Sequence, residues 1–117
     1  MTTIFERVTT ALGNLSPAIP FALGAYKTAS GADLPDTFIS FTLVNGDGVQ
    51  HADNAETLRE YTIQISIFSR AGLITLPNVD AVLLAAGFIK GPERQLTTDE
   101  QTRHYGLARD YIYLEDL

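Results

Sequence analysis

The stretch EYTIQISI, residues 60–67, is the most regular part of the sequence. In it, Tyr61, Ile63, Ile65 and Ile67 alternate strictly with polar residues. Successive side chains of a β-strand point to opposite faces, so this alternation places all four apolar side chains on one face. The stretch therefore predicts a strand with one buried and one solvated face, which is typical of an antiparallel sheet.

Weaker strand patterns lie on both sides of this stretch. Residues 37–44 alternate in the same way, and residues 102–114 form a long closing segment that is rich in tyrosine. Residues 21–27 and 93–98 are shorter candidates. Together with residues 60–67, these segments predict a sheet of four to five strands.

The tyrosines of the closing strand have two possible roles. Tyr105, Tyr111 and Tyr113 share one face of this strand, because even numbers of positions separate them. Their rings either cover the core or line a subunit interface, where an amphipathic ring gives contact area at low entropic cost. We favour the core.

Two segments carry the signals of helices. A capping box opens the first at Thr3, and apolar residues at helical spacing follow until Gly13, which is placed to end the helix in a left-handed conformation. The second is expected over residues 75–86, with Thr75 as its cap and a stop at Gly87.

The order of these elements is helix, strands, helix, strands. Sequential strands usually pair as neighbours, and helices must then cover the apolar face of the sheet. The sequence therefore predicts an α+β fold in which a mostly antiparallel sheet of four to five strands has two helices packed on one face. Residues 1–117 are expected to form a single domain, because no linker or repeat divides them.

Composition narrows the classes of ligand. The net charge is −6 and the 8 basic residues are scattered singly, so we do not expect nucleic acid as the main ligand, whereas a basic protein partner would suit the surface. The absence of cysteine excludes disulfides and thiolate chemistry. The apolar runs are too short to cross a bilayer and the first residues lack a signal-peptide pattern, which indicates a cytosolic product.

The stretch VNGDGVQHAD, residues 44–53, collects glycines and oxygen-bearing side chains, as a metal site would. An EF-hand loop needs oxygen ligands at alternate positions, but Val49 occupies one of them whether the loop starts at Asn45 or at Asp47. A dinucleotide-binding turn needs a third glycine and a following helix, which are missing here. Asn-Gly and Asp-Gly are instead typical of a solvated turn.

Histidine and serine form no catalytic pattern. His51 and His104 are isolated in the sequence, and His104 is expected at the surface of its strand. Ser40 and Ser66 occupy polar positions of predicted strands, and no serine lies in a G-x-S-x-G setting. We therefore name no catalytic residue, no metal ligand and no cofactor.

Residues 45–59 form a polar run between two predicted strands, and we interpret this run as a long loop. Loops of this length in compact domains are commonly functional, so it is the best candidate for a contact surface with another subunit or a partner. The candidate interface residues are Asp47, His51, Asp53, Glu56 and Arg59.

These features occur in an order that resembles a known family. An N-terminal helix, an extended segment with prolines, a strand that ends in a polar run, the stretch REYTIQISIFSRAG at 59–72 before a helix, and Tyr111-Ile112-Tyr113 in the last strand cover nearly the whole chain. This order is similar to that of the tail terminator proteins of long-tailed bacteriophages, also called tail completion or tail-to-head joining proteins. Tail-tube and head-completion proteins of similar size are close alternatives.

The resemblance implies a non-enzymatic protein of the virion that forms a ring, expected to be a hexamer, at the head-proximal end of the tail tube. Its partners would be copies of itself, the tail-tube protein and the head connector or stopper protein; DNA would only pass through the channel, and no membrane would be involved. It would reside in the virion tail, and in the host cytoplasm during assembly. The alternative from another class is a small cellular α+β domain that binds a ligand in a concave apolar pocket.

Overall fold

The computed structural model describes residues 3–15, 18–24, 34–52, 55–74, 76–99 and 103–116. In chain order, the elements are α1 (Ile4–Leu12), β1 (Phe21–Leu23), β2 (Thr37–Ala52), β3 (Ala55–Ser69), α2 (Val79–Ala85), β4 (Ile89–Asp99) and β5 (His104–Asp116).

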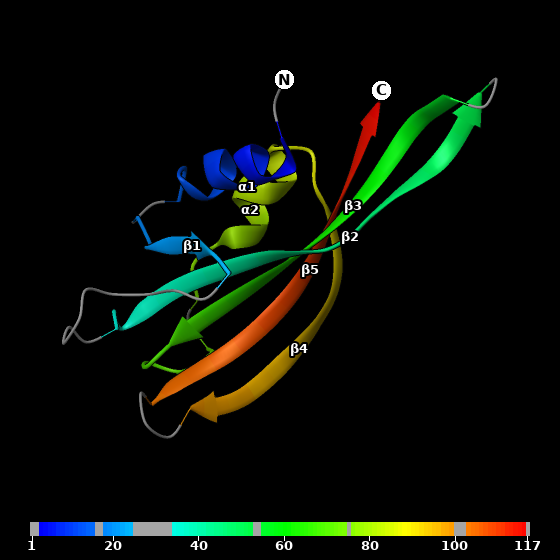
Figure 1. The fold of residues 1–117 in the computed structure, drawn as a ribbon. Coiled ribbons are helices and arrows are strands. Elements are labelled where there is room, and N and C mark those ends of the chain that lie inside the picture. Colours follow the sequence, from blue (N-terminus) through cyan, green and yellow to red (C-terminus); the bar gives the residue numbers. More distant parts are fainter. Residues whose placement is uncertain are drawn as a thin grey trace.

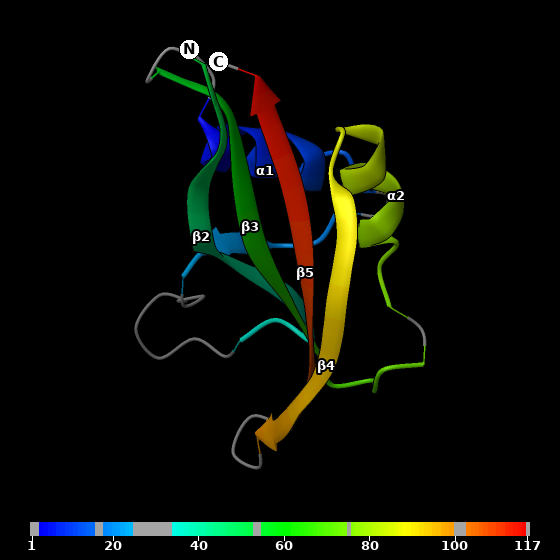
Figure 2. The same ribbon diagram turned by 90° about the vertical axis from the view of Figure 1, so that its right-hand side faces the viewer.

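The strands form one sheet in the order β1-β2-β3-β5-β4. β1 pairs with β2 in parallel, and all the other neighbours are antiparallel. Both helices cover the same face of this sheet, as Figure 1 shows. Figure 2 looks onto the other face, with α1 behind the strands. The predicted α+β fold is confirmed, including its mostly antiparallel sheet.

The core lies between the helices and the apolar face of β3. Ile63, Ile65 and Ile67 are fully buried there, which confirms the face predicted from residues 60–67. Burying an aliphatic side chain of this size contributes about 1.5–3 kcal/mol. Val8 and Leu12 of α1 pack against them, so the helix and the strand bury each other's apolar stripes.

Helix α1 begins as predicted but ends differently. The side chain of Thr3 accepts a hydrogen bond from the Glu6 backbone N–H at 3.1 Å, so Thr3 is the N-cap. Gly13 has φ −65°, so the expected left-handed ending is wrong. The backbone instead tightens, with the Leu15 N–H bonded to the Leu12 carbonyl at 3.2 Å, and this turn brings the Leu15 side chain into the core.

Helix α2 is shorter than predicted because its cap is Asn78. The Asn78 side chain accepts a hydrogen bond from the Ala81 N–H at 3.2 Å, whereas Thr75, the expected cap, lies outside the described residues. Gly87 ends the helix at φ +97°, where a glycine is favoured. The chain then folds back, the Phe88 N–H bonds to the Leu83 carbonyl at 3.0 Å, and the Phe88 ring reaches the core.

Strand β4 starts earlier than the predicted strand over residues 93–98 and includes Gly91 and Pro92. Pro92 is tolerated because β4 is at the edge of the sheet, where a missing backbone donor leaves no neighbouring strand unpaired. The register shifts between Lys90 and Glu93. β1 is described only as Phe21–Leu23, and residues 25–27 of the predicted strand lie outside the described part.

Candidate functional site: the hairpin arm and the polar cluster

The predicted loop at residues 45–59 is a β-hairpin, so that interpretation was wrong. β2 continues to Ala52 and β3 starts at Ala55. The register shifts between Leu43 and Asn45 and twice more between Gly48 and His51. Each extra residue reverses the phase of the alternation, so a continuous strand loses its period of two in the sequence.

This hairpin projects from the body of the protein, and we call residues 45–59 the arm. β5 accompanies β3 only as far as the pair of Leu58 with Asp116. Among the described residues, the arm beyond this pair consists of β2 and β3 alone, and Figure 1 shows it pointing away from both helices. The principal extents of 53, 27 and 24 Å and a radius of gyration of 15.7 Å reflect this elongation, because a compact chain of this length would have about 13.4 Å.

Two contacts hold the base of the arm. Gly46 pairs with Tyr61, and a Cβ on Gly46 would lie 3.2 Å from the Tyr61 ring, so the glycine leaves room for the ring to cover the backbone. The Arg59 guanidinium donates to the Gly46 carbonyl at 3.1 Å. The base is thus tied across both strands by Tyr61, which was predicted in a strand, and by Arg59, which was predicted in a loop.

The predicted interface residues lie on this arm, and the strand pairing gives the backbone partners of four of them. Asp47 pairs with Glu60, His51 with Glu56, and Arg59 with Gly48. Of the five predicted side chains, only that of Arg59 is described, and it contacts its own hairpin. Asp53 and the side chains of Asp47, His51 and Glu56 lie outside the described part, so their role in an interface stays a prediction.

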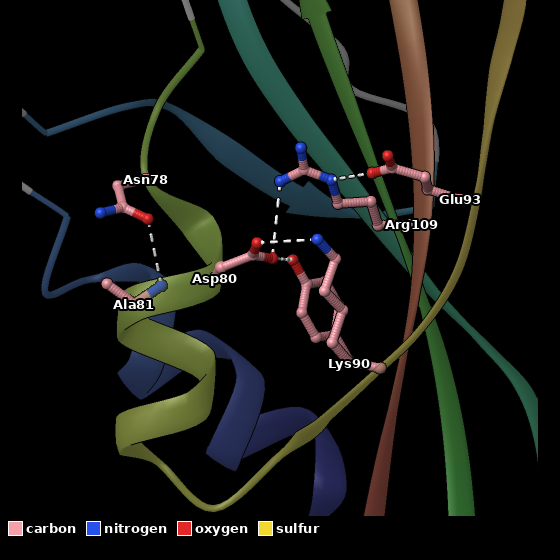
Figure 3. Close-up of polar contacts among 7 residues, drawn as sticks. Asn78, Asp80, Ala81, Lys90, Glu93 and Arg109 are labelled. Atoms are coloured by element: carbon pink, nitrogen blue, oxygen red, sulfur yellow. Dashed lines mark hydrogen bonds and ion pairs between the residues drawn. The ribbon is translucent and has the colours of Figure 1, made fainter.

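A cluster of charged side chains joins α2 to the sheet, as Figure 3 shows. Asp80, in the first turn of α2, accepts a hydrogen bond from the Tyr111 hydroxyl. Its carboxylate also lies 3.2 Å from Lys90 Nζ and 3.5 Å from Arg109 Nη1. Arg109 Nε donates to Glu93 at 2.6 Å, so three elements meet in one network.

The network shifts the pKa values of Asp80 and Tyr111. Burial opposes ionisation of Asp80, but the hydrogen bonds from Tyr111 and Lys90 and the charge of Arg109 outweigh it and lower the pKa of Asp80 below 3.8. Burial, followed by the bond to Asp80, raises the pKa of Tyr111 well above 10.0. Asp80 is therefore held ionised and Tyr111 neutral at pH 7, which is the arrangement that their hydrogen bond requires.

This polar cluster acts as a clamp for α2. Each of its two carboxylates is neutralised by a cation, and each cation contacts a carboxylate. Because Tyr111 donates to an acid of lowered pKa, Asp80 is a poor base and Tyr111 a poor nucleophile. The cluster was not predicted from the sequence, although Arg109 marks its position by interrupting the otherwise apolar face that Tyr111 and Tyr113 share.

The closing strand divides its tyrosines between two environments. Tyr111 is fully buried in the core and Tyr113 packs against it, which confirms the favoured role for these two. Tyr105, by contrast, is 42% exposed. The difference arises because the helices cover only the end of β5 that carries Tyr111 and Tyr113.

His104 is buried, so its expected surface position was wrong. Only 2% of the residue is exposed. Its Nε2 lies 2.8 Å from the Pro35 carbonyl oxygen, and its ring meets the Phe38 ring edge-on at 4.9 Å. Residues just before β2 thus cover the end of β5 on the face without helices, a contact between distant segments that no local pattern reveals.

Two hollows lie elsewhere on the described surface. One is an open groove of about 440 Å³ between the helices, lined by Arg7, Thr10, Ala11, Asn14, Val82, Ala85 and Ala86. The other holds about 160 Å³ over the sheet face without helices, near Ser40, Gln64 and Ser66. Within the described ranges, no three His, Asp or Glu side chains gather as a metal site would require. Nor is any helix in them long and apolar enough to span a bilayer.

No protein-family model matches the chain, and no curated protein matches it at a significant level.

Proposed function

We propose that this protein is a structural component of a phage virion that oligomerises into a ring at the head-proximal end of the tail tube and joins the tail to the head connector. The order of its sequence features supports this assignment, and so does the arm, which is the observation that carries the proposal. A hexamer is the expected ring, as in the proteins that the sequence resembles.

The arm needs a neighbour for a physical reason. A two-stranded ribbon is marginally stable alone in water, and part of residues 45–59 extends beyond the third strand. Packing this segment against the body of an adjacent subunit would bury its surface and order it at the same time. If the arm contacts a different surface on the neighbour, each subunit can both give and receive an arm, and such a head-to-tail interface closes a ring when the rotation between subunits allows it.

The charge of the arm suits assembly more than catalysis. Asp47, Asp53 and Glu56 make it acidic, and the whole chain carries −6. A ring with acidic walls would repel the DNA that passes through it, whereas acidic arms would seek cations on a neighbouring subunit or partner. We infer that the arm makes contacts between proteins and carries out no chemical step.

A shortened arm tests the proposal. Replacing residues 48–59 by Asn-Gly joins the paired residues Asp47 and Glu60 through a two-residue turn that favours hairpins. The variant should stay folded in urea unfolding followed by circular dichroism, but it should fail to form rings in light scattering and electron microscopy, and fail to cap purified tail tubes. Rings like those of the wild type would refute the role of the arm.

A second variant separates the shape of the arm from its charge. The triple substitution Asp47→Asn, Asp53→Asn and Glu56→Gln keeps the length of the hairpin and removes three negative charges. Rings that form with this variant but not with the shortened arm would show that surface burial drives assembly. Loss of rings with both variants would show that the carboxylates make the contact.

A further inference from the structure

The sheet face without helices carries an apolar strip at the base of the arm. Ile89 of β4 pairs with Ile112 of β5. Residues paired directly across strands share a face, and Leu114 lies two positions beyond Ile112 on that same face. Leu58 lies on this face too, because its partner Asp116 is two positions beyond Leu114. We call Leu58, Ile89, Ile112 and Leu114 the sheet-face strip.

The strip is open to solvent. Ile89 is 52% and Leu114 43% exposed, and the other two members are half-buried. The same face is polar further along the sheet, where Ser40 pairs with Ser66 and Thr42 with Gln64. These polar pairs separate the strip from a second apolar group at the other end of this face, where Phe38 stacks on Phe68. Contiguous exposed apolar residues like those of the strip mark contact sites.

Carboxylates border the strip. Glu60 pairs with Leu114, and Asp116 pairs with Leu58, so both acids lie on the same face as the apolar side chains. The cations next to strip members in the sequence, Arg59 and Lys90, belong to the opposite face. Arg94 lies further along the face of the strip, where it donates to Gln64. The strip therefore presents an apolar centre with an acidic border.

The charge of the chain argues against a second copy as the occupant of the strip. Lys90 and Arg109 are engaged with Asp80, Arg7 with Glu115, and Arg70 with Asp36. At a net charge of −6, a second copy would bring mostly carboxylates to the acidic border. We propose that the sheet-face strip binds a segment of a different protein, one that presents apolar side chains flanked by lysine or arginine. This inference goes beyond the proposed ring and holds whether or not the ring forms.

The test uses two peptides of equal length, one alternating valine with lysine and the other valine with glutamate, both labelled with fluorescein. Fluorescence anisotropy at about 0.15 M salt, where exposed charges are screened beyond about 8 Å, measures their binding. We expect saturable binding of the valine–lysine peptide only. Leu114→Asp should weaken this binding roughly tenfold or more, because it places a charge in the apolar centre.

Ile74→Asp is the matched control. Ile74 is fully exposed and lies outside the strip, so the substitution adds the same negative charge elsewhere. If net charge alone attracted the valine–lysine peptide, both substitutions would strengthen its binding equally. Equal binding of this peptide by Leu114→Asp and Ile74→Asp would therefore overturn the proposal. Failure of the wild type to bind the valine–lysine peptide would do the same.

Two further readouts keep the result decisive. Ile89→Asp changes the strip from a different strand and should weaken binding as Leu114→Asp does, which covers the case in which one variant does not fold. Light scattering of the same samples detects self-association. A wild type that dimerises through the strip, with a monomeric Leu114→Asp variant, would make the occupant a second copy and refute the proposal.

Discussion

The clamp between α2 and the sheet gives the sharpest prediction about stability. Tyr111→Phe removes the hydroxyl that donates to Asp80 and keeps the ring in the core. A hydrogen bond to a charged group contributes about 1.5–3 kcal/mol. Asp80 keeps Lys90 and Arg109 as partners, so we expect the lower part of this range, about 1.5–2 kcal/mol.

This loss converts into a measurable change of Tm. An unfolding entropy of about 2.1 cal/mol/K per residue gives about 0.25 kcal/mol/K for this chain, so Tm should fall by about 6–8 °C. Calorimetry and urea unfolding at pH 7 measure the difference. Tyr105→Phe is the matched control, because Tyr105 lies on the same strand and is 42% exposed; it should change Tm little.

The difference between wild type and Tyr111→Phe should also depend on pH. The pKa of Asp80 is lowered in the folded protein, so its stabilising effect is complete above 3.8 and is lost as pH falls through the folded value. The pKa of Tyr111 is raised, so its effect is complete below 10.0 and is lost as pH rises above that value. A difference that stays constant from pH 2 to pH 11, or equal stabilities of Tyr111→Phe and Tyr105→Phe, would refute the clamp.

Two further substitutions test the buried histidine and the base of the arm. His104→Phe keeps an aromatic ring against Phe38 but removes the donor to the Pro35 carbonyl, so urea unfolding should show a loss of about 1–2 kcal/mol; unchanged stability would mean that this bond contributes nothing. Gly46→Val places side-chain atoms where the Tyr61 ring lies, so we expect a loss of about 1–3 kcal/mol and a changed ring environment for Tyr61 in NMR spectra, whereas an unmoved Tyr61 signal would contradict the packing described here.

The sequence predicted those parts of the fold that depend on local regularity. Residues 60–67 keep a strict period of two because β3 pairs with β5 without a register shift from Leu58 to Ser69. The cap at Thr3 was recognisable because its hydrogen bond spans only three residues. Patterns of this kind involve only residues that are close in the sequence, so they can be recognised without knowledge of the tertiary structure.

The clamp and the buried position of His104 depend on contacts between distant segments. Asp80 meets a partner 31 positions away in Tyr111, and His104 meets the Pro35 carbonyl 69 positions away, so neither environment can be inferred from neighbouring residues. The arm escaped prediction for the opposite reason. Its backbone is regular, but its bulges remove the regularity from the order of the side chains.

The same bulges bear on how the arm can meet a partner. β2 is covered by β1 only from Ile39 to Phe41, so the outer edge of its arm segment has no neighbouring strand among the described residues. A straight, unpaired edge would accept a strand from any chain, and bulges are a means by which proteins prevent this. The bulges of β2 therefore disfavour simple strand addition at this edge, and recognition must depend on side chains. An arm that is selective in this way can extend from the body without causing indiscriminate aggregation, which is what the proposed ring would require of it.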